Sequence, residues 1–256
     1  MAVERITSRS NPLVTRLRKL NSKRSARREE GVFCGEGPKL LAEALKWGAD
    51  LETVICAEGT ELPTLPPTTR VVEVPASLLS AVADTETPQG IVFVCKSAEL
   101  TLPKTLKGRR YLVLDGVQDP GNVGTIWRTA DAFGADGLIL CNGCADPLSP
   151  KTVRSTMGAI FRMPVYEATL EETAQALAAA GIPLYTTALR EDTVDVRELT
   201  LSRSAVIIGS EGRGVSDLAL ELCSRTVKIP MTSRCESLNA AMAASVVLWE
   251  MARSEL

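Results

Sequence analysis

The chain of 256 residues contains no histidine. This absence excludes Ser-His-Asp and Cys-His catalysis, a histidine general base and histidine-ligated zinc. Long apolar runs are also missing, because none approaches the roughly 18 residues of a membrane-spanning helix. Residues 1–21 carry charges throughout and contain no apolar segment, so we expect no signal peptide, no membrane association and a cytoplasmic location.

The seven cysteines are scattered and odd in number, which favours reduced thiols in a cytosolic protein. Only Cys141 and Cys144 form a C-x-x-C pair. A second pair or a histidine would be needed to complete a four-ligand zinc site, so we expect no bound metal. The pair is compatible with redox chemistry, but two small residues in a loop after a strand are the simpler interpretation.

Charge is distributed unevenly along the chain. The net charge is −2 at pH 7, yet the first 28 residues contain nine basic residues and one acid. A basic arm on an acidic body indicates a polyanionic partner, most simply RNA or DNA, although a solvated helix face has the same composition. The candidate RNA-binding residues are Arg5, Arg9, Arg16, Arg18, Lys19, Lys23, Arg24, Arg27 and Arg28.

The first hundred residues have the pattern of a small α/β domain, expected over residues 1–97 and followed by a polar linker over 98–110. The predicted helices cover residues 11–28 (as one helix or two), 39–47 and 76–82. The predicted strands cover residues 52–56, 70–74 and 91–95.

Strands and helices then alternate over residues 111–256. Segments such as 112–114 and 206–208 are apolar on both faces, as a buried parallel sheet requires. We therefore expect a second α/β domain, with a mostly parallel sheet covered by helices on both sides. The predicted strands cover residues 111–115, 137–140, 183–187, 205–209 and 226–229. The predicted helices cover residues 123–133, 151–160, 170–180, 215–222 and 238–252.

The loop that follows the first strand of this domain is rich in polar residues. Asn122 is placed to cap the next helix, and Arg128 projects away from the apolar stripe of that helix. Arg128 is therefore either a solvated arginine or a phosphate-binding group at the carboxyl edge of the sheet, where ligands of α/β proteins bind.

Two later loops also join a strand to a helix. Residues 209–214 contain glycines that let a ligand approach the backbone, although tight turns need glycine too. Their G-x-x-G-x-G spacing is not the dinucleotide fingerprint, and Glu211 would repel a phosphate, which disfavours a dehydrogenase or kinase. Residues 229–239 lead into a helix rich in small residues, with Ser237 or Glu236 as its candidate cap.

In this order and on these elements, the loops resemble the three motifs of the SpoU/TrmH family of RNA ribose 2′-O-methyltransferases, within the SPOUT superfamily. The matching segments are Asn122-x-Gly124-x-x-x-Arg128-x-Ala130, Gly209-x-Glu211-Gly212-x-Gly214, and Ile229-Pro230-Met231 with Ser237-Leu238-Asn239. Residues 1–97 are similar to the L30e-like substrate-binding domain of that family. The chain departs from the usual pattern at Ser233, normally glycine, and at residues 240–242, normally Val-Ser-Val.

The resemblance implies S-adenosylmethionine as cofactor, a homodimer, and a SPOUT domain over 111–256 whose chain end forms a trefoil knot. It implies methyl transfer to a ribose 2′-OH in structured RNA, with 23S rRNA favoured over tRNA. An inactive RNA-binding or ribosome-assembly protein of the same fold, and methylation of a tRNA base, are the alternatives.

The resemblance also assigns roles to individual residues. The implied catalytic residues are Arg128, Asn122, Glu211, Ser237 and Asn239. The implied cofactor contacts are Gly209, Ile229, Leu238, Met231 and Thr187. Arg128 is either the general base or a group that positions the ribose and its neighbouring phosphate; a guanidinium is effectively always protonated, which favours positioning.

Overall fold

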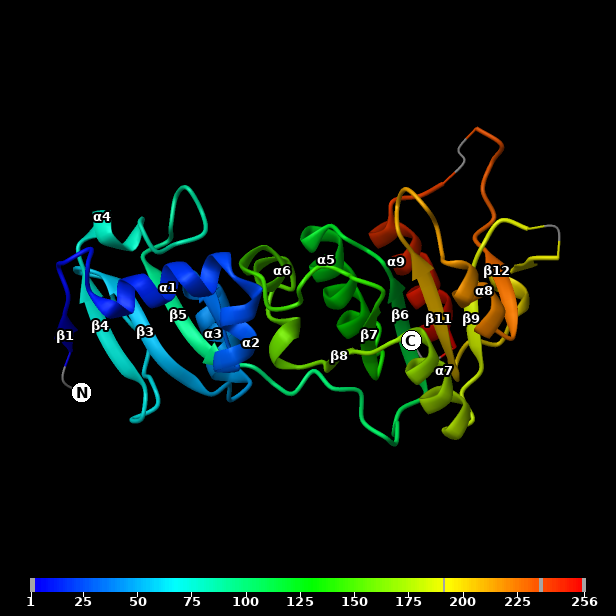
Figure 1. Ribbon diagram of the computed structural model, residues 1–256, viewed down its shortest axis with the longest axis horizontal. Helices are drawn as coiled ribbons and strands as arrows, with labels where there is room; N and C mark the ends of the chain where they lie inside the picture. Colours follow the sequence, from blue (N-terminus) through cyan, green and yellow to red (C-terminus); the bar gives the residue numbers. More distant parts are fainter. Residues whose placement is uncertain (1–2, 191, 235–236, 255–256) are drawn as a thin grey trace. The chain divides into compact units, whose positions relative to one another are not determined.

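The computed structural model describes residues 3–190, 192–234 and 237–254 (Figure 1). It divides into two compact units, which are described separately. The first unit comprises residues 1–98 and 146–162, and the second comprises residues 99–145 and 163–256.

The first unit is built on a mixed sheet with the strand order β1-β4-β3-β5-β2. β4 runs parallel to β1 and β3, whereas β5 is antiparallel to β3 and β2. The sequence pattern did not predict β1, which has two residues, or β2, whose sequence contains Gly35, a residue that disfavours strands. The strands are β1 (Glu4–Arg5), β2 (Val32–Glu36), β3 (Leu51–Ala57), β4 (Arg70–Val74) and β5 (Ile91–Lys96).

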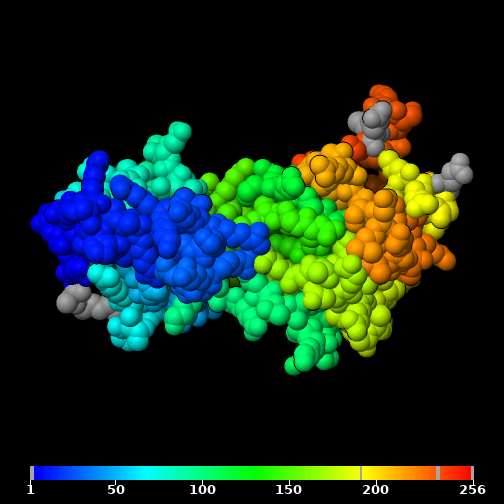
Figure 2. Space-filling model, in the orientation of Figure 1, coloured from blue at the N-terminus to red at the C-terminus, as the bar shows by residue number. Residues whose placement is uncertain are grey.

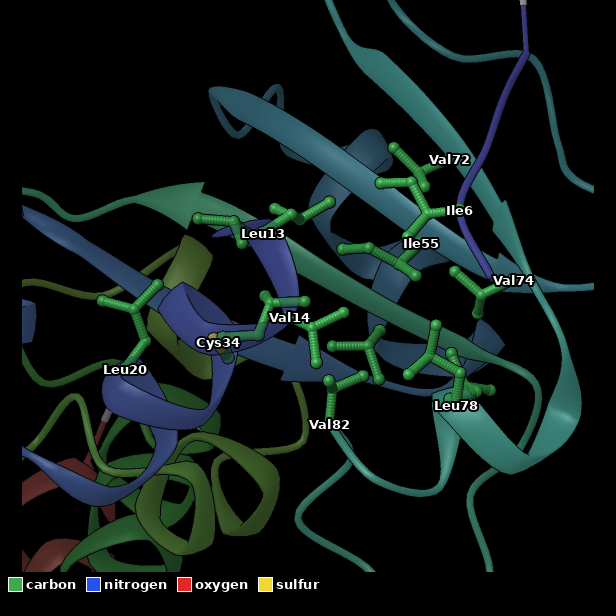
Figure 3. Close-up of a cluster of buried hydrophobic side chains, with 14 of the residues drawn as sticks. Ile6, Leu13, Val14, Leu20, Cys34, Ile55, Val72, Val74, Leu78 and Val82 are labelled. Atoms are coloured by element: carbon green, nitrogen blue, oxygen red, sulfur yellow. The ribbon is translucent and has the colours of Figure 1, made fainter. Parts of the chain in front are cut away.

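Helices cover this sheet with apolar side chains. The segment expected as one helix or two forms two, and the Asn11 side chain caps the first by accepting from the backbone N–H of Leu13 at 2.9 Å. Leu13 and Val14 of that helix pack with Ile55 and other strand residues in a buried cluster (Figure 3). The helices are α1 (Pro12–Ser22), α2 (Arg24–Glu30), α3 (Pro38–Lys46) and α4 (Ala76–Leu79).

Residues 146–162 belong to the first unit although the sequence pattern placed them in the second domain. They contain α6 (Pro150–Ser155) and the 3-10 helix η1 (Ala159–Phe161), where one helix over 151–160 was expected. Gly158 separates the two with φ of 93°, a left-handed conformation that ends helices. The segment is attached to the first unit by side-chain contacts of Asp146, Arg154, Phe161 and Arg162.

The second unit contains a parallel sheet with the strand order β10-β12-β9-β11-β6-β7-β8. Every recorded pairing in it is parallel, which confirms the predicted α/β class with a mostly parallel sheet. Gly209 pairs with Asp115, so β11 and β6 end at the same level. The strands are β6 (Arg110–Asp115), β7 (Gly137–Cys141), β8 (Val165–Glu167), β9 (Leu184–Thr187), β10 (Val194–Asp195), β11 (Ser204–Gly209) and β12 (Arg225–Lys228).

Helices lie on both faces of this sheet (Figure 1). α7 (Leu170–Ala179) and α8 (Asp217–Leu222) pack with each other and with β9, whereas α9 (Ala240–Ala252) packs with α5 (Pro120–Ala132), β6 and β11. A short 3-10 helix, η2 (Val196–Glu198), follows β10. In the part of the chain that the structure describes, no helix combines the length and apolar character needed to cross a membrane.

Two of the expected helix caps are wrong. α5 begins at Pro120 and is capped by Asp119, which accepts from the backbone N–H of Asn122 at 2.9 Å, so Asn122 lies inside the helix. α9 begins at Ala240 and is capped by Asn239 rather than Ser237. The other candidate cap, Glu236, lies outside the described residues.

Candidate active site

The loops at the carboxyl ends of β9, β11 and β12 enclose a cavity of about 310 Å³ with the start of α9. Such a volume falls in the range of small-molecule and cofactor sites. The structure brings all five expected cofactor contacts together here. Thr187, Gly209, Ile229, Met231 and Leu238 line this cavity, which we call the β11 cavity.

The loop after β11 is closed on itself by its backbone. Ser210 and Gly214 exchange two N–H to carbonyl hydrogen bonds, each 2.9 Å long. A Cβ atom at Gly209 would lie 2.2 Å from the carbonyl carbon of Gly214, so a side chain there has no room. Gly214 itself has φ of 68°, in the left-handed region that favours glycine. Two glycines of the second motif are therefore required by the local backbone.

A buried carboxylate, Asp115, fixes the other end of this loop. Asp115 is 4% exposed at the end of β6. Its two oxygens accept from Asn142 Nδ2 and from the backbone N–H of Ser216, both at 2.6 Å. The sequence pattern did not predict Asp115 as a positioning residue, although a carboxylate at the end of an apolar strand could have indicated it.

A chain of side-chain hydrogen bonds joins the three motif loops. Asn239 Oδ1 accepts from the backbone N–H of Ala241 at 2.9 Å, so its Nδ2 is directed to Asn122 Oδ1, 3.3 Å away. Asn122 must then present its own Nδ2, which donates to Glu211 Oε1. The helix cap at Asn239 thereby determines the orientation of both amides and holds the Glu211 carboxylate.

The other two expected catalytic residues take different positions. Ser237 lines the β11 cavity together with Glu211. Arg128 is exposed on α5 and does not line that cavity. Within the described residues, Arg128 forms no hydrogen bond or ion pair. Its guanidinium is therefore available to a group from outside this chain.

The C-x-x-C residues are buried and reduced. Cys144 Sγ donates to the carbonyl of Cys141 at 3.1 Å. Burial raises the pKa of Cys141 to about 12 and that of Cys144 to about 11, so both stay protonated at neutral pH. These properties fit small packing residues better than a redox pair. Across the described ranges, no group of three or more Cys, Asp or Glu side chains could hold a metal ion.

The basic N-terminal residues separate into exposed and structural groups. Arg27 is only 4% exposed: its Nε and Nη2 donate to Asp146 Oδ2 at 2.9 and 2.6 Å, and its Nη1 donates to the Leu20 carbonyl. Arg27 thus differs from the expected exposed arm, because its guanidinium holds the fold. Arg16 and Arg28 are half-buried and paired with acids. The exposed members are Arg5, Arg9, Arg18, Lys19, Lys23 and Arg24. Figure 2 shows the N-terminal stretch that contains them in dark blue at the surface.

The fold and the β11 cavity define an α/β protein with a ligand site at the carboxyl edge of a parallel sheet. The SpoU rRNA Methylase family model matches residues 109–249, and the MRM3-like substrate binding domain matches residues 11–92. The chain belongs to the SpoU rRNA methylase family.

Similar proteins cover nearly the whole chain. The 23S rRNA (guanosine(2553)-2′-O)-methyltransferase RlmP of Bacillus subtilis is 36% identical over 97% of this chain and 99% of its own length. The 23S rRNA (uridine(2479)-2′-O)-methyltransferase of Streptomyces viridochromogenes is 30% identical over 100% and 94%. The crystal structure of an AdoMet-bound rRNA methyltransferase from Sinorhizobium meliloti superposes with a TM-score of 0.86, 32% identity and 99% coverage of both chains.

Proposed function

We propose that this protein transfers a methyl group from S-adenosylmethionine to a ribose 2′-OH of ribosomal RNA, most simply 23S rRNA. The observation that carries the proposal is the hydrogen-bonded chain Asn239–Asn122–Glu211 beside the β11 cavity. Relatives that span nearly the whole chain are named 23S rRNA 2′-O-methyltransferases, which supports the reaction and the RNA class. An inactive protein of this fold would not need the three motif loops joined in this way.

The β11 cavity fits S-adenosylmethionine in size and chemistry. The bound cofactor supplies a methyl group on a sulfonium cation. Backbone groups near Gly209, Ile229 and Leu238 would hold the uncharged adenine, and Met231 adds apolar surface. Glu211 also lines the cavity, and its carboxylate suits a cation where it would repel a polyphosphate. The Glu211 carboxylate therefore favours the cationic S-adenosylmethionine over a nucleotide with a polyphosphate.

The residues beside the cavity would orient the attacking hydroxyl. Glu211 Oε1 is occupied by Asn122, which fixes the carboxylate and leaves Oε2 as an acceptor for a ribose hydroxyl. Ser237 offers a second hydroxyl contact at the same wall. Arg128 would bind the phosphate next to the target nucleotide and position its 2′-OH. This role needs no deprotonation of a guanidinium.

A homodimer would supply Arg128 from one subunit to the site of the other. Its support is an exposed apolar stripe on α9, where Met242, Val246 and Trp249 are 56%, 37% and 48% exposed. Their i, i+4, i+7 spacing places them along one side of the helix, a pattern that favours packing against another helix. We also infer the trefoil knot of the SPOUT fold, which the resemblance to that family implies.

The N-terminal domain, predicted over residues 1–97 and extended in the structure by residues 146–162, would bind the RNA. The linker 98–110 would join it to the methyltransferase domain predicted over the rest of 111–256. Its six exposed basic residues would contact phosphates, so binding should weaken steeply with salt. The match to a substrate-binding domain over residues 11–92 supports this division. Because ribosomal RNA is the proposed substrate, we place the protein in the cytoplasm.

The proposal is tested by methyl transfer from labelled S-adenosylmethionine to ribosomal RNA that lacks native modifications. The wild type should produce one 2′-O-methyl site, and Arg128→Ala should lose it while still binding the cofactor. Arg203→Ala is a matched control, because among the described residues this exposed arginine bonds only to backbone carbonyls at the end of α7. Label on a base, label on tRNA alone, or cofactor binding without transfer to any RNA would contradict the proposal.

A further inference from the structure

A second cavity lies on the other side of the loop after β11. Its volume is about 310 Å³, and its lining includes Gln118, Asn142 and Arg213. Ser210, Glu211 and Gly212 line both this cavity and the β11 cavity. The loop is thus a single wall between the two spaces, and a molecule in the second cavity lies one backbone layer from the cofactor site.

The second cavity offers hydrogen-bonding groups that the protein itself leaves unused. Gln118 is exposed after β6 and has no hydrogen-bond partner within the described residues. The same is true of Arg213 in the loop after β11. Asn142 commits Nδ2 to Asp115 and so presents Oδ1 as an acceptor. One complete amide, one carbonyl oxygen and one guanidinium therefore line the same space.

Hydrogen bonds fix the position of Asn142 in this cavity. Asn142 has φ of 50° and is held by the buried Asp115 carboxylate, which also holds Ser216 at the end of the loop. Two acids line the cavity, Asp115 and Glu211, and the first of them is buried and hydrogen-bonded. Glu211 is turned to Asn122. The cavity is preformed for a neutral, hydrogen-bonding ligand with a phosphate at its exposed side.

We propose that this second cavity binds the base of the nucleotide whose ribose is methylated. Gln118 and Asn142 read the edge of the unstacked base, because side-chain amides place a donor and acceptors at the spacing of base edges. Arg213 binds the phosphate of the same nucleotide. With the base here, its ribose reaches the shared wall at Glu211, beside the cofactor. This inference rests on the proposed function and adds its specificity-determining residues.

The test uses an RNA fragment with the mapped target nucleotide and three further versions in which only that base is changed. The wild type should favour the native base in kcat/KM. Gln118→Ala should lower kcat/KM on the native base at least about fivefold, the lower limit for one lost base contact, and reduce the preference among the four RNAs. Arg213→Ala should slow all four RNAs by the same factor and keep the preference.

Cofactor binding and thermal unfolding separate this result from damage to the fold. Both should be unchanged in Gln118→Ala, since its exposed side chain has no partner among the described residues. Gln175→Ala, an exposed glutamine on α7, is the matched control and should behave as the wild type. A wild-type base preference retained in Gln118→Ala, or no preference in the wild type, would overturn the base site alone. A wild type that methylates no ribose would instead overturn the proposed function.

Discussion

Replacement of Gly209 by alanine should damage the loop that separates the two cavities. The new Cβ would lie 2.2 Å from the Gly214 carbonyl carbon and 2.3 Å from the Val215 nitrogen. Because these are backbone atoms, the loop must move by about 1 Å before the new Cβ lies at ordinary contact distances. Overpacking of this kind costs about 1–3 kcal/mol of the free energy of unfolding. The Ser210–Gly214 hydrogen bonds would also be weakened, at about 1 kcal/mol each.

Calorimetry without cofactor should therefore show Gly209→Ala unfolding about 2–12 °C below the wild type from the overpacking alone, at about 2–4 °C per kcal/mol for a domain of this size. Titration with S-adenosylmethionine should show weaker binding, because the displaced loop lines the β11 cavity. Gly212→Ala is the control in the same loop: nothing lies within 4 Å of its added Cβ, so its unfolding temperature should match the wild type. Equal unfolding temperatures and cofactor affinities for Gly209→Ala and the wild type would refute the reasoning.

Other predictions concern the first unit and the buried thiols. Asp146→Ala leaves the Arg27 charge buried without its partner, so urea titration should show a loss of about 3–5 kcal/mol; a loss under 1 kcal/mol would contradict the buried pair. Arg16 lowers the pKa of Glu52 below its usual 4.5, so this carboxylate stabilises the fold at neutral pH and the gain disappears as the pH falls through the lowered value. Glu52→Gln should thus be less stable by about 0.5–1 kcal/mol at pH 7 and equal to the wild type in acid, and a constant difference would argue against the ion pair. Burial raises the pKa of Cys144 to about 11, so iodoacetamide at pH 7.5 should label it only after unfolding; rapid labelling in the folded protein would contradict its burial.

The sequence pattern was most informative in the parallel sheet. Segments apolar on both faces, such as 206–208, are buried between helices as expected, since parallel strands must be covered on both sides. The motif loops also gave the residues that line the β11 cavity. Their roles as catalytic or cofactor-binding groups remain predictions.

The start of α5 and the burial of Arg27 could not be predicted from the sequence pattern. Asp119 and Asn122 are both good caps, and only the structure shows that the helix starts at the first of them. The basic character of Arg27 indicates an exposed position, but its partner Asp146 is 119 residues away. Periodicity describes neighbours along the chain, so it carries no information about such a pair.

The packing of residues 146–162 in the first unit means that this unit is not one continuous stretch of chain. The polypeptide passes between the units three times, at residues 98–99, 145–146 and 162–163. A fragment ending at residue 98 would leave Arg27 buried without Asp146, and Phe33 without the ring of Phe161. Transplanting the first unit of this chain into another protein would therefore require two segments to be moved together, the N-terminal stretch and residues 146–162 after β7.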